Sequence, residues 1–207
     1  MPQTRSDSTL DRRDQIMAAA LSVFTKRGFH QTSMHDISAE AGISVGLIYR
    51  YFANKEAVIA AMGDEHKRHI RDVLDQAREA PSLLESLEVL FTAHCCEESP
   101  KVQSVFVVDL YSEASRNPQV AEMIRDVTDL AMEGLTDLIA RAPETESTTH
   151  GLEPRQIAEL IYAVARGMLM RDILQPAEMT AAERRERQLE VTRRFWRLLF
   201  NQEAVLA

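Results

Sequence analysis

Three adjacent residues, Tyr49, Arg50 and Tyr51, carry side chains whose chemistry suits contact with a nucleic acid. The guanidinium of Arg50 is a forked donor that can bind the edge of a guanine at two points. The tyrosine hydroxyls can donate to phosphate oxygens while their rings contact sugars or a thymine methyl group. The small and apolar residues just before them are Val45, Gly46 and Leu47. These would allow apolar base contacts and a close approach of the backbone, so the segment favours a DNA-reading helix.

The residues that would position this segment are typical of two short helices joined by a tight turn. Ser33 is a helix cap, and Asp36 three residues later completes a capping-box pattern. Gly42 ends this first helix, and Ser44 caps the second. In a helix-turn-helix of this kind the second helix lies in the major groove of DNA. Taken alone, the layout is equally compatible with a structural corner whose tyrosines cover the protein core.

The residues on both sides of this segment decide between the two interpretations. They are Phe24, Gly28, Thr32, Ser33, Asp36, Ile37, Ala41 to Ser44, Tyr49 to Phe52, Lys55 and Glu56. With these types at this spacing, roughly the first quarter to third of the chain resembles the DNA-binding domain of the TetR family of bacterial transcriptional repressors. The resemblance places Lys55 near the DNA backbone. Val45 and Leu47 depart from the pattern, because the family often has a polar and a small residue there.

The distribution of charge is consistent with DNA approaching one end of the chain. The residues expected to contact DNA are Thr32, Ser33, Ser44, Val45, Gly46, Leu47, Tyr49, Arg50, Tyr51 and Lys55. The whole chain has a net charge of -8, but residues 1–55 have a net charge of +2 and the remainder of -10. The acidic remainder would repel misplaced phosphate, although acidity is also common among soluble proteins.

The composition indicates a soluble, all-helical protein. The chain of 207 residues is long enough for one or two domains, and it has only seven glycines and seven prolines. We find no continuous apolar segment of about 20 residues and no apolar signal core, so we expect a cytoplasmic protein without a membrane partner. The adjacent Cys95 and Cys96 do not make a disulfide framework and are expected to be buried, reduced thiols.

We expect an all-α fold of about nine helices in two domains. Residues 1–54 would form an N-terminal arm and a three-helix helix-turn-helix DNA-binding domain. Residues 55–207 would form a larger helical domain for ligand binding and dimerisation, joined to the first by a long helix from about Lys55 to Glu79. Further helices are expected at about residues 81–96, 101–115, 118–141, 154–174 and 180–201, and the first helix at about 9–27.

The larger domain contains two sets of candidate residues. The candidates for lining a mainly apolar ligand pocket are Phe91, His94, Cys95, Phe106, Tyr111, Met123, Met132, Tyr162 and Met168. Most of these would be ordinary core residues, with a minority touching ligand. The last two helices resemble the dimerisation pair of the family, and the candidates for that interface are Ile161, Val164, Gly167, Met168, Phe195, Trp196 and Leu199. The alternative is that these helices complete the core of a monomer.

Other chemistry is less well supported by the sequence. The candidates for an acid–base site are His94, Asp109, Tyr111 and Glu113. They belong to no nucleophile elbow, phosphate-binding glycine loop or dinucleotide motif, so we do not expect an enzyme. His66 and His69 are three residues apart, but one apolar-flanked and one exposed histidine is the better interpretation than a metal site. We expect no metal and no cofactor.

These features predict a homodimeric repressor that binds double-stranded operator DNA of pseudo-palindromic sequence. A small-molecule effector would release it by binding better to a conformation in which the two DNA-binding domains are wrongly spaced. The alternatives are a helical protein-interaction module, which would use the exposed tyrosines on a protein surface, and a TetR-like activator.

Overall fold

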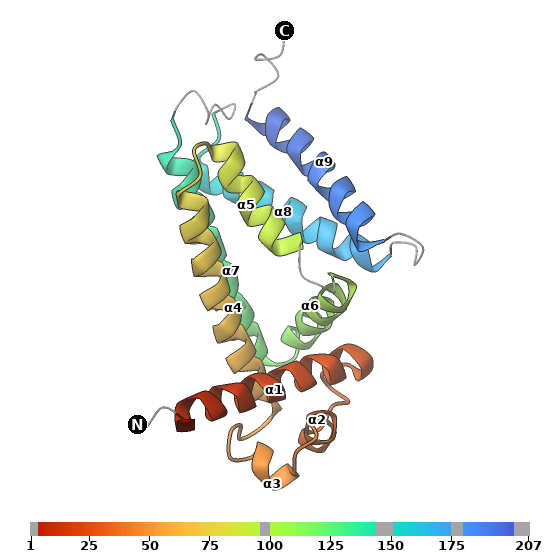
Figure 1. Ribbon diagram of the computed structural model, residues 1–207. Helices are drawn as coiled ribbons and strands as arrows, with labels where there is room; N and C mark the ends of the chain where they lie inside the picture. Colours follow the sequence, from red (N-terminus) through yellow and green to blue (C-terminus); the bar gives the residue numbers. More distant parts are fainter. Residues whose placement is uncertain (1–3, 96–99, 144–150, 175–179, 201–207) are drawn as a thin grey trace. The chain divides into compact units, whose positions relative to one another are not determined.

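The computed structural model describes residues 4–95, 100–143, 151–174 and 180–200, and all regular structure within these ranges is helical (Figure 1). The helices are α1 (Thr4–Arg27), α2 (Met34–Glu40), α3 (Val45–Ile48), α4 (Lys55–Arg78), α5 (Leu83–Cys95), α6 (Pro100–Ala114), α7 (Pro118–Arg141), α8 (Pro154–Ile173) and α9 (Ala181–Leu199). These nine helices of the described ranges confirm the all-α fold class expected from the sequence.

The observed helix ends follow local capping chemistry. α1 begins at Thr4 rather than near residue 9, so more of the N-terminal segment is helical than its polarity suggested. α5 begins at Leu83 rather than at the preceding proline, because the hydroxyl of Ser82 accepts a hydrogen bond from the backbone N–H of Glu85. Of the helices in the described ranges, none combines the length and apolar character needed to cross a membrane.

The chain divides into two compact units. The first contains residues 1–66 and 105–127, and the second contains residues 67–104 and 128–207. The chain passes between the units three times, within α4, within α6 and within α7. These units are defined by packing, and the functional boundary expected after residue 54 remains a prediction.

The first unit has its own apolar core, which holds α1, α2 and α3 together. Phe24 and Ile16 of α1, Ile37 of α2 and Ile48 of α3 are all fully buried in it. α1 ends at Arg27, and the next residue, Gly28, has a positive φ of 79°, which glycine adopts at no steric cost. The N–H of Gly28 donates to the carbonyl of Phe24 over 2.7 Å. The short helices are therefore held by their buried side chains, which are Met34, Ile37 and Ser38 of α2 and Ile48 of α3.

The second unit is built on a separate apolar core. The buried side chains of its main cluster come from α5, α7, α8 and α9, and they include Phe91, Ile139, Ile157 and Trp196. The ring of Trp196 meets that of Phe91 edge-on with centroids 6.5 Å apart. A smaller cluster joins the second half of α4 to α7. This core is large and apolar, and it is distinct from the core beneath the helix-turn-helix.

Candidate nucleic-acid interface

The two caps predicted for the helix-turn-helix are present. The side chain of Ser33 accepts from the N–H of Asp36, and the carboxylate of Asp36 accepts from the N–H of Ser33 over 2.9 Å, which completes the capping box. The side chain of Ser44 accepts from the N–H of Leu47 over 3.2 Å and caps α3. Gly42 lies between the helices with a positive φ of 66°. The sequence therefore specifies both helix starts and the turn between them.

α3 is a single turn, continued by hydrogen-bonded turns through Tyr51, and its outward face is uncovered. Ile48 is fully buried beneath it, whereas Tyr49 is 53% exposed and Arg50 is also exposed. Gly46 faces open space, and no atom lies within 4 Å of the position that a Cβ would occupy there. Val45, Leu47 and Tyr51 are half-buried. We call the outward surface of residues 44–51 the reading face.

Two of the expected DNA-contact residues use their polar groups inside the protein. Thr32 is only 3% exposed, and its hydroxyl donates to the carbonyl of Gly28 over 2.8 Å. The ammonium group of Lys55 donates to the carbonyls of Phe29, His30 and Thr32 over 2.9, 3.3 and 3.3 Å. It also lies 4.4 Å from the centroid of the Phe29 ring. Lys55 therefore ties α4 to residues 28–32, which we call the supporting loop.

Ion pairs fasten α2 to the end of α1. Lys26 and Arg27, in the last turn of α1, pair with Glu40 and Asp36 of α2 over 2.9 and 2.6 Å. Hydrogen bonds from Ser33, more than the charge of Arg27, lower the pKa of Asp36. The pKa of Glu40 is lowered mainly by a hydrogen bond from Ser22 and then by Lys26. These two cations are thus engaged in holding the helices and are not part of the reading face.

A cation also packs beneath the reading face. The guanidinium carbon of Arg13 in α1 lies 4.6 Å from the centroid of the Phe52 ring, directly after the reading face. Nearby, the side-chain amide of Gln15 donates to the carbonyl of Ala41 over 2.7 Å, so α1 also holds the end of α2. Sequence periodicity did not single out these supports, because each depends on residues far apart in the chain.

The candidate pocket residues divide between the cores of the two units. Phe91, Met132, Tyr162 and Met168 belong to the core of the second unit, whereas Phe106 and Met123 pack against the core of the first. Tyr111 is exposed, and the side chains of His94 and Cys95 lie outside the described part of the chain. Helical spacing identified these residues as apolar, but it could not show which core each one enters. A ligand pocket in the second unit remains a prediction.

The second unit does contain a polar group beside its apolar core. The hydroxyl of Tyr162 lies 3.1 Å from that of Thr128 and accepts a hydrogen bond from Arg166 over 2.7 Å. The guanidinium carbon of Arg166 also lies 4.8 Å from the Tyr162 ring centroid. Of these three residues, only Tyr162 was expected at a ligand site. Arg166 follows it by one turn on α8, and Thr128 is brought to it by the packing of α7.

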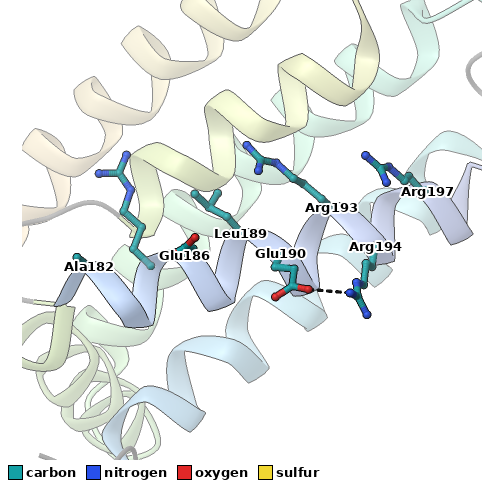
Figure 2. A pocket seen from close by; sticks show the side chains of 8 residues that line it. Ala182, Glu186, Leu189, Glu190, Arg193, Arg194 and Arg197 are labelled. Atoms are coloured by element: carbon teal, nitrogen blue, oxygen red, sulfur yellow. Dashed lines mark hydrogen bonds and ion pairs between the residues drawn. The ribbon is translucent and has the colours of Figure 1, made fainter. Parts of the chain in front are cut away.

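A surface groove of about 560 Å³ runs along α9, and Figure 2 shows the residues that line it. They are Ala182, Arg185, Glu186, Leu189, Glu190, Arg193, Arg194 and Arg197. Arg194 pairs with Glu190 over 2.7 Å, as the dashed line in Figure 2 marks, and Arg193 pairs with Glu88 of α5. None of the candidate pocket residues lines this groove, so it is separate from the predicted ligand site.

All of the candidate dimer residues except Gly167 are buried in the core of the second unit or packed against it. Ile161, Met168 and Trp196 are buried in their own chain, with Trp196 only 4% exposed, so they serve the core of the second unit. Val164, Phe195 and Leu199 are half-buried, and Gly167 is exposed. The large apolar side chains left exposed on α8 and α9 are Leu160, Met170, Val191 and Leu198. The spacing of apolar residues alone did not separate these exposed positions from the buried ones.

Two of the candidate acid–base residues, Asp109 and Glu113, have structural roles. The carboxylate of Asp109 accepts from the N–H of Phe29 over 2.6 Å. The buried Glu113 pairs with Arg116 over 2.7 Å at the end of α6. Within the described ranges, no group of three or more histidine, cysteine or acidic side chains is arranged to hold a metal ion.

Comparison with known proteins places this architecture in a family. Residues 16–62 match the family described as "Bacterial regulatory proteins, tetR family". Residues 83–200 match the one described as "BetI-type transcriptional repressor, C-terminal". The first match spans the second half of α1, all of α2 and α3, and the start of α4, and the second spans α5 to α9.

Several curated proteins are similar over most of their length. The transcriptional regulator UidR of Escherichia coli K12 is 27% identical over 186 residues, which cover 84% of this chain and 89% of UidR. The nicotine-responsive repressor HdnoR of Paenarthrobacter nicotinovorans is 23% identical and the alignment covers 83% of this chain and 88% of HdnoR. The activator FasR of Mycolicibacterium smegmatis is 29% identical, with 75% of this chain and 69% of FasR covered.

Solved structures share the fold. Salmonella enterica GusR superposes with a TM-score of 0.74 at 26% identity, covering 93% of this chain and 96% of GusR. The fatty acid degradation regulator FadR of Bacillus halodurans gives a TM-score of 0.77 at 21% identity, with 89% and 94% covered. FadR of Bacillus subtilis, solved with stearoyl-CoA, gives a TM-score of 0.72 at 19% identity, and the superposition covers 86% of this chain and 95% of FadR. The two FadR structures show likeness of fold alone. With both parts matched, the chain belongs to the TetR family of DNA-binding transcriptional regulators, which are not enzymes.

Proposed function

We propose that this regulator is a homodimeric repressor that covers a pseudo-palindromic operator and is released by a small, mainly apolar ligand. The observation that carries the proposal is the reading face, a capped helical turn with exposed Tyr49 and Arg50 above a fully buried Ile48. A buried anchor with two exposed donors is the arrangement needed to hold side chains rigidly in a major groove. The functional division that we propose remains residues 1–54 for DNA and 55–207 for ligand and dimer.

The expected DNA contacts divide into direct contacts and supports. We assign direct contact to the members that lie at the start of α2 or on the reading face and are exposed or half-buried. They are Ser33, Ser44, Val45, Gly46, Leu47, Tyr49, Arg50 and Tyr51. Thr32 and Lys55 are assigned instead to support, because their donors are already bound to carbonyls of the supporting loop. A bound cation can still attract phosphate through its charge, but it would not read a base.

We assign the dimer contact to an apolar seam along α8 and α9. Its members are Leu160, Ala163, Gly167 and Met170 on α8, Leu174 directly after α8, and Val191 and Leu198 on α9. The α8 members alternate in steps of three and four residues, the spacing of a helix–helix seam. Leu174 is 84% exposed and Leu198 is 59% exposed, which is unusual for leucines on an otherwise packed unit. No atom lies within 4 Å of a Cβ at Gly167, which leaves room for a partner helix.

We place the effector in the core of the second unit, beside the polar group of Thr128, Tyr162 and Arg166. A mainly apolar molecule with one acceptor would use the neighbouring core for affinity and this group for orientation. Two of the similar proteins are described with ligands of partly apolar character, nicotine for HdnoR and stearoyl-CoA for the Bacillus subtilis FadR structure. The range of these ligands supports a ligand-responsive regulator without naming the molecule for this chain.

Release requires that the ligand binds one conformation of the dimer more tightly than another. We propose that α4 tilts, because its first residue, Lys55, holds the supporting loop and its later residues lie in the second unit. A tilt that changes the distance between two reading faces would break contacts on one half-site. The coupling between two such sites is typically about 1 to 3 kcal/mol, or roughly one to two orders of magnitude in affinity.

The test is reciprocity between ligand and operator. An operator is first selected from randomised duplex DNA, and small molecules are then screened for release of the protein from it. For any molecule found, saturating operator should lower its affinity by the same factor by which it lowers operator affinity. Independent binding of the two would show that the second unit is a dimerisation platform and not a sensor.

Activation of transcription is the second candidate, and it is favoured by the similarity to the activator FasR. The two functions differ in where the protein sits relative to a promoter. Transcription in vitro from a template that carries the selected operator separates them, because a repressor lowers transcript yield and an activator raises it.

A further inference from the structure

A carboxylate on α6 is bonded to the backbone of the helix-turn-helix. Oδ2 of Asp109 accepts a hydrogen bond from the N–H of Phe29 over 2.6 Å. Both carboxylate oxygens lie 3.6 Å from the position that a Cβ on Gly28 would occupy, so the carboxylate rests on the turn that ends α1. A charged acceptor makes this bond stronger than a bond between neutral groups. The contact joins residues 80 positions apart in the sequence.

Aromatic packing holds α6 at this place. The ring of Phe106, three residues before Asp109 on α6, is stacked on that of Phe24 with centroids 6.1 Å apart. Phe24 in turn packs on Phe29 at 5.2 Å. Residues three apart lie on the same helix face, so one face of α6 supplies both the apolar contact and the carboxylate. The hydrogen bond therefore has a rigid base on the α6 side.

The supporting loop is held from a second direction by Lys55. Its ammonium group donates to three carbonyls of the loop, while Asp109 accepts the N–H of Phe29. The backbone of Phe29 is thus bonded on its C=O side to α4 and on its N–H side to α6. α2 and the reading face follow directly from this loop, so its orientation sets theirs.

We propose that Asp109 is a positioning residue for DNA recognition, fixing the supporting loop so that the reading face is presented in one orientation. The proposal rests on the DNA-reading role of α3 proposed above. α6 is one of the helices through which the chain passes between the two units. The hydrogen bond therefore gives α6 a direct connection to the helix-turn-helix that is independent of α4.

Loss of this bond should affect specific and non-specific DNA binding differently. Specific contacts need side chains aimed at base edges, so they depend on a fixed reading face. Non-specific binding depends on charge near phosphate and tolerates a change of orientation. Asp109→Ala should weaken binding to a selected operator by about tenfold, the range expected for one charge-assisted hydrogen bond, and should leave binding to sheared DNA nearly unchanged.

The experiment uses the full chain labelled with ¹⁵N-phenylalanine, whose seven phenylalanines give a simple amide spectrum. The Phe29 amide should move upfield in Asp109→Ala, and its exchange with solvent should accelerate by at least about tenfold. Asp109→Asn keeps a neutral acceptor and should give an intermediate shift and an intermediate operator affinity. The control is Asp126→Ala, which removes the same charge from an exposed site of the same unit. It should change neither the Phe29 amide shift nor the operator affinity.

The outcomes separate this inference from the function on which it rests. If the wild-type chain enriches no operator, the reading role fails and the positioning role falls with it. If the wild type binds an operator and Asp109→Ala binds it equally tightly, the positioning role alone is overturned. If Asp109→Ala does not fold, the same two measurements are made on Asp109→Asn. A changed Phe29 amide shift with unchanged operator affinity would overturn the positioning role. A changed amide shift together with weaker operator binding would support it.

Discussion

The guanidinium of Arg27, in the last turn of α1, lies 2.6 Å from the carboxylate of Asp36 in the first turn of α2. The same carboxylate accepts the N–H of Ser33 and so caps α2. One acidic side chain therefore both starts the first helix of the helix-turn-helix and attaches it to α1.

This arrangement predicts a loss of stability in acid. The pKa of Asp36 in the folded chain is lowered from its ordinary value of 3.8, chiefly by hydrogen bonds from Ser33. Its contribution to stability is therefore fully present well above that value and is lost as the pH falls through the folded pKa. We expect the melting temperature to fall less steeply below about pH 4 in Asp36→Asn than in the wild type. Equal slopes in circular-dichroism melts of the two proteins would contradict this role, and Asp126→Asn is the matched control.

Two glycine substitutions should affect different properties of the protein, one its stability and the other its binding to the operator. A Cβ on Gly134 would clash with the side chain of the buried Leu74, so Gly134→Ala must displace that side chain or the helix and should destabilise the fold by about 1 to 3 kcal/mol. A Cβ on Gly46 would meet no atom within 4 Å, so Gly46→Ala should leave the fold intact. It should nevertheless weaken operator binding, because the added methyl group stands on the reading face. Urea melts and operator titration of both variants test the pair, and a stable Gly134→Ala would show that the α4–α7 contact is looser than described.

Arg50 and Lys55 should respond differently to truncation. Arg50→Ala should weaken operator binding by about 1 to 3 kcal/mol and relax preference at one base pair, with thermal stability unchanged. Tyr49→Phe should weaken binding by a smaller amount. Lys55→Ala should instead lower stability by roughly 1 to 2 kcal/mol, because three carbonyls lose their donor at a partly exposed site. Operator affinity and melting temperature are measured for each variant, and unchanged operator affinity in both Arg50→Ala and Tyr49→Phe would refute the reading face.

Substitutions on the apolar seam and in the core of the second unit should have different effects. Leu198→Arg should dissociate the dimer while keeping the helical content of the chain, since this leucine is already exposed. Trp196→Ala should instead unfold or destabilise the single chain by about 3 to 5 kcal/mol, because the indole fills the core of the second unit. Sedimentation of both variants, with Leu152→Arg as an exposed control outside the seam, distinguishes the two roles. A dimeric Leu198→Arg would place the interface elsewhere.

Local chemistry explains why much of this molecule could be predicted from its sequence. The capping box of Ser33 and Asp36, the cap at Ser44 and the left-handed Gly42 involve residues only a few positions apart, and all three are present. The order and approximate ends of the helices follow from apolar periodicity in the same way.

The remainder depends on contacts between distant residues. The sequence places Asp109 on an apolar helix but does not show that it meets Phe29, and it marks Lys55 as basic without showing that its donors are occupied. Phe106 and Met168 have similar apolar patterns yet enter different cores. On α9 the apolar positions form two stripes, and only burial shows that Trp196 belongs to the core and Leu198 to the surface.

Selection of operators from randomised duplex DNA tests most directly whether two copies of the reading face bind one operator. Wild-type protein should enrich an inverted repeat whose half-sites are separated by about one helical turn, roughly 10 base pairs, or somewhat more. Arg50→Ala, selected in parallel, should enrich the same spacing with reduced preference at one base pair in each half-site. Enrichment of no common sequence, or of a single unrepeated half-site bound by one chain, would contradict the account.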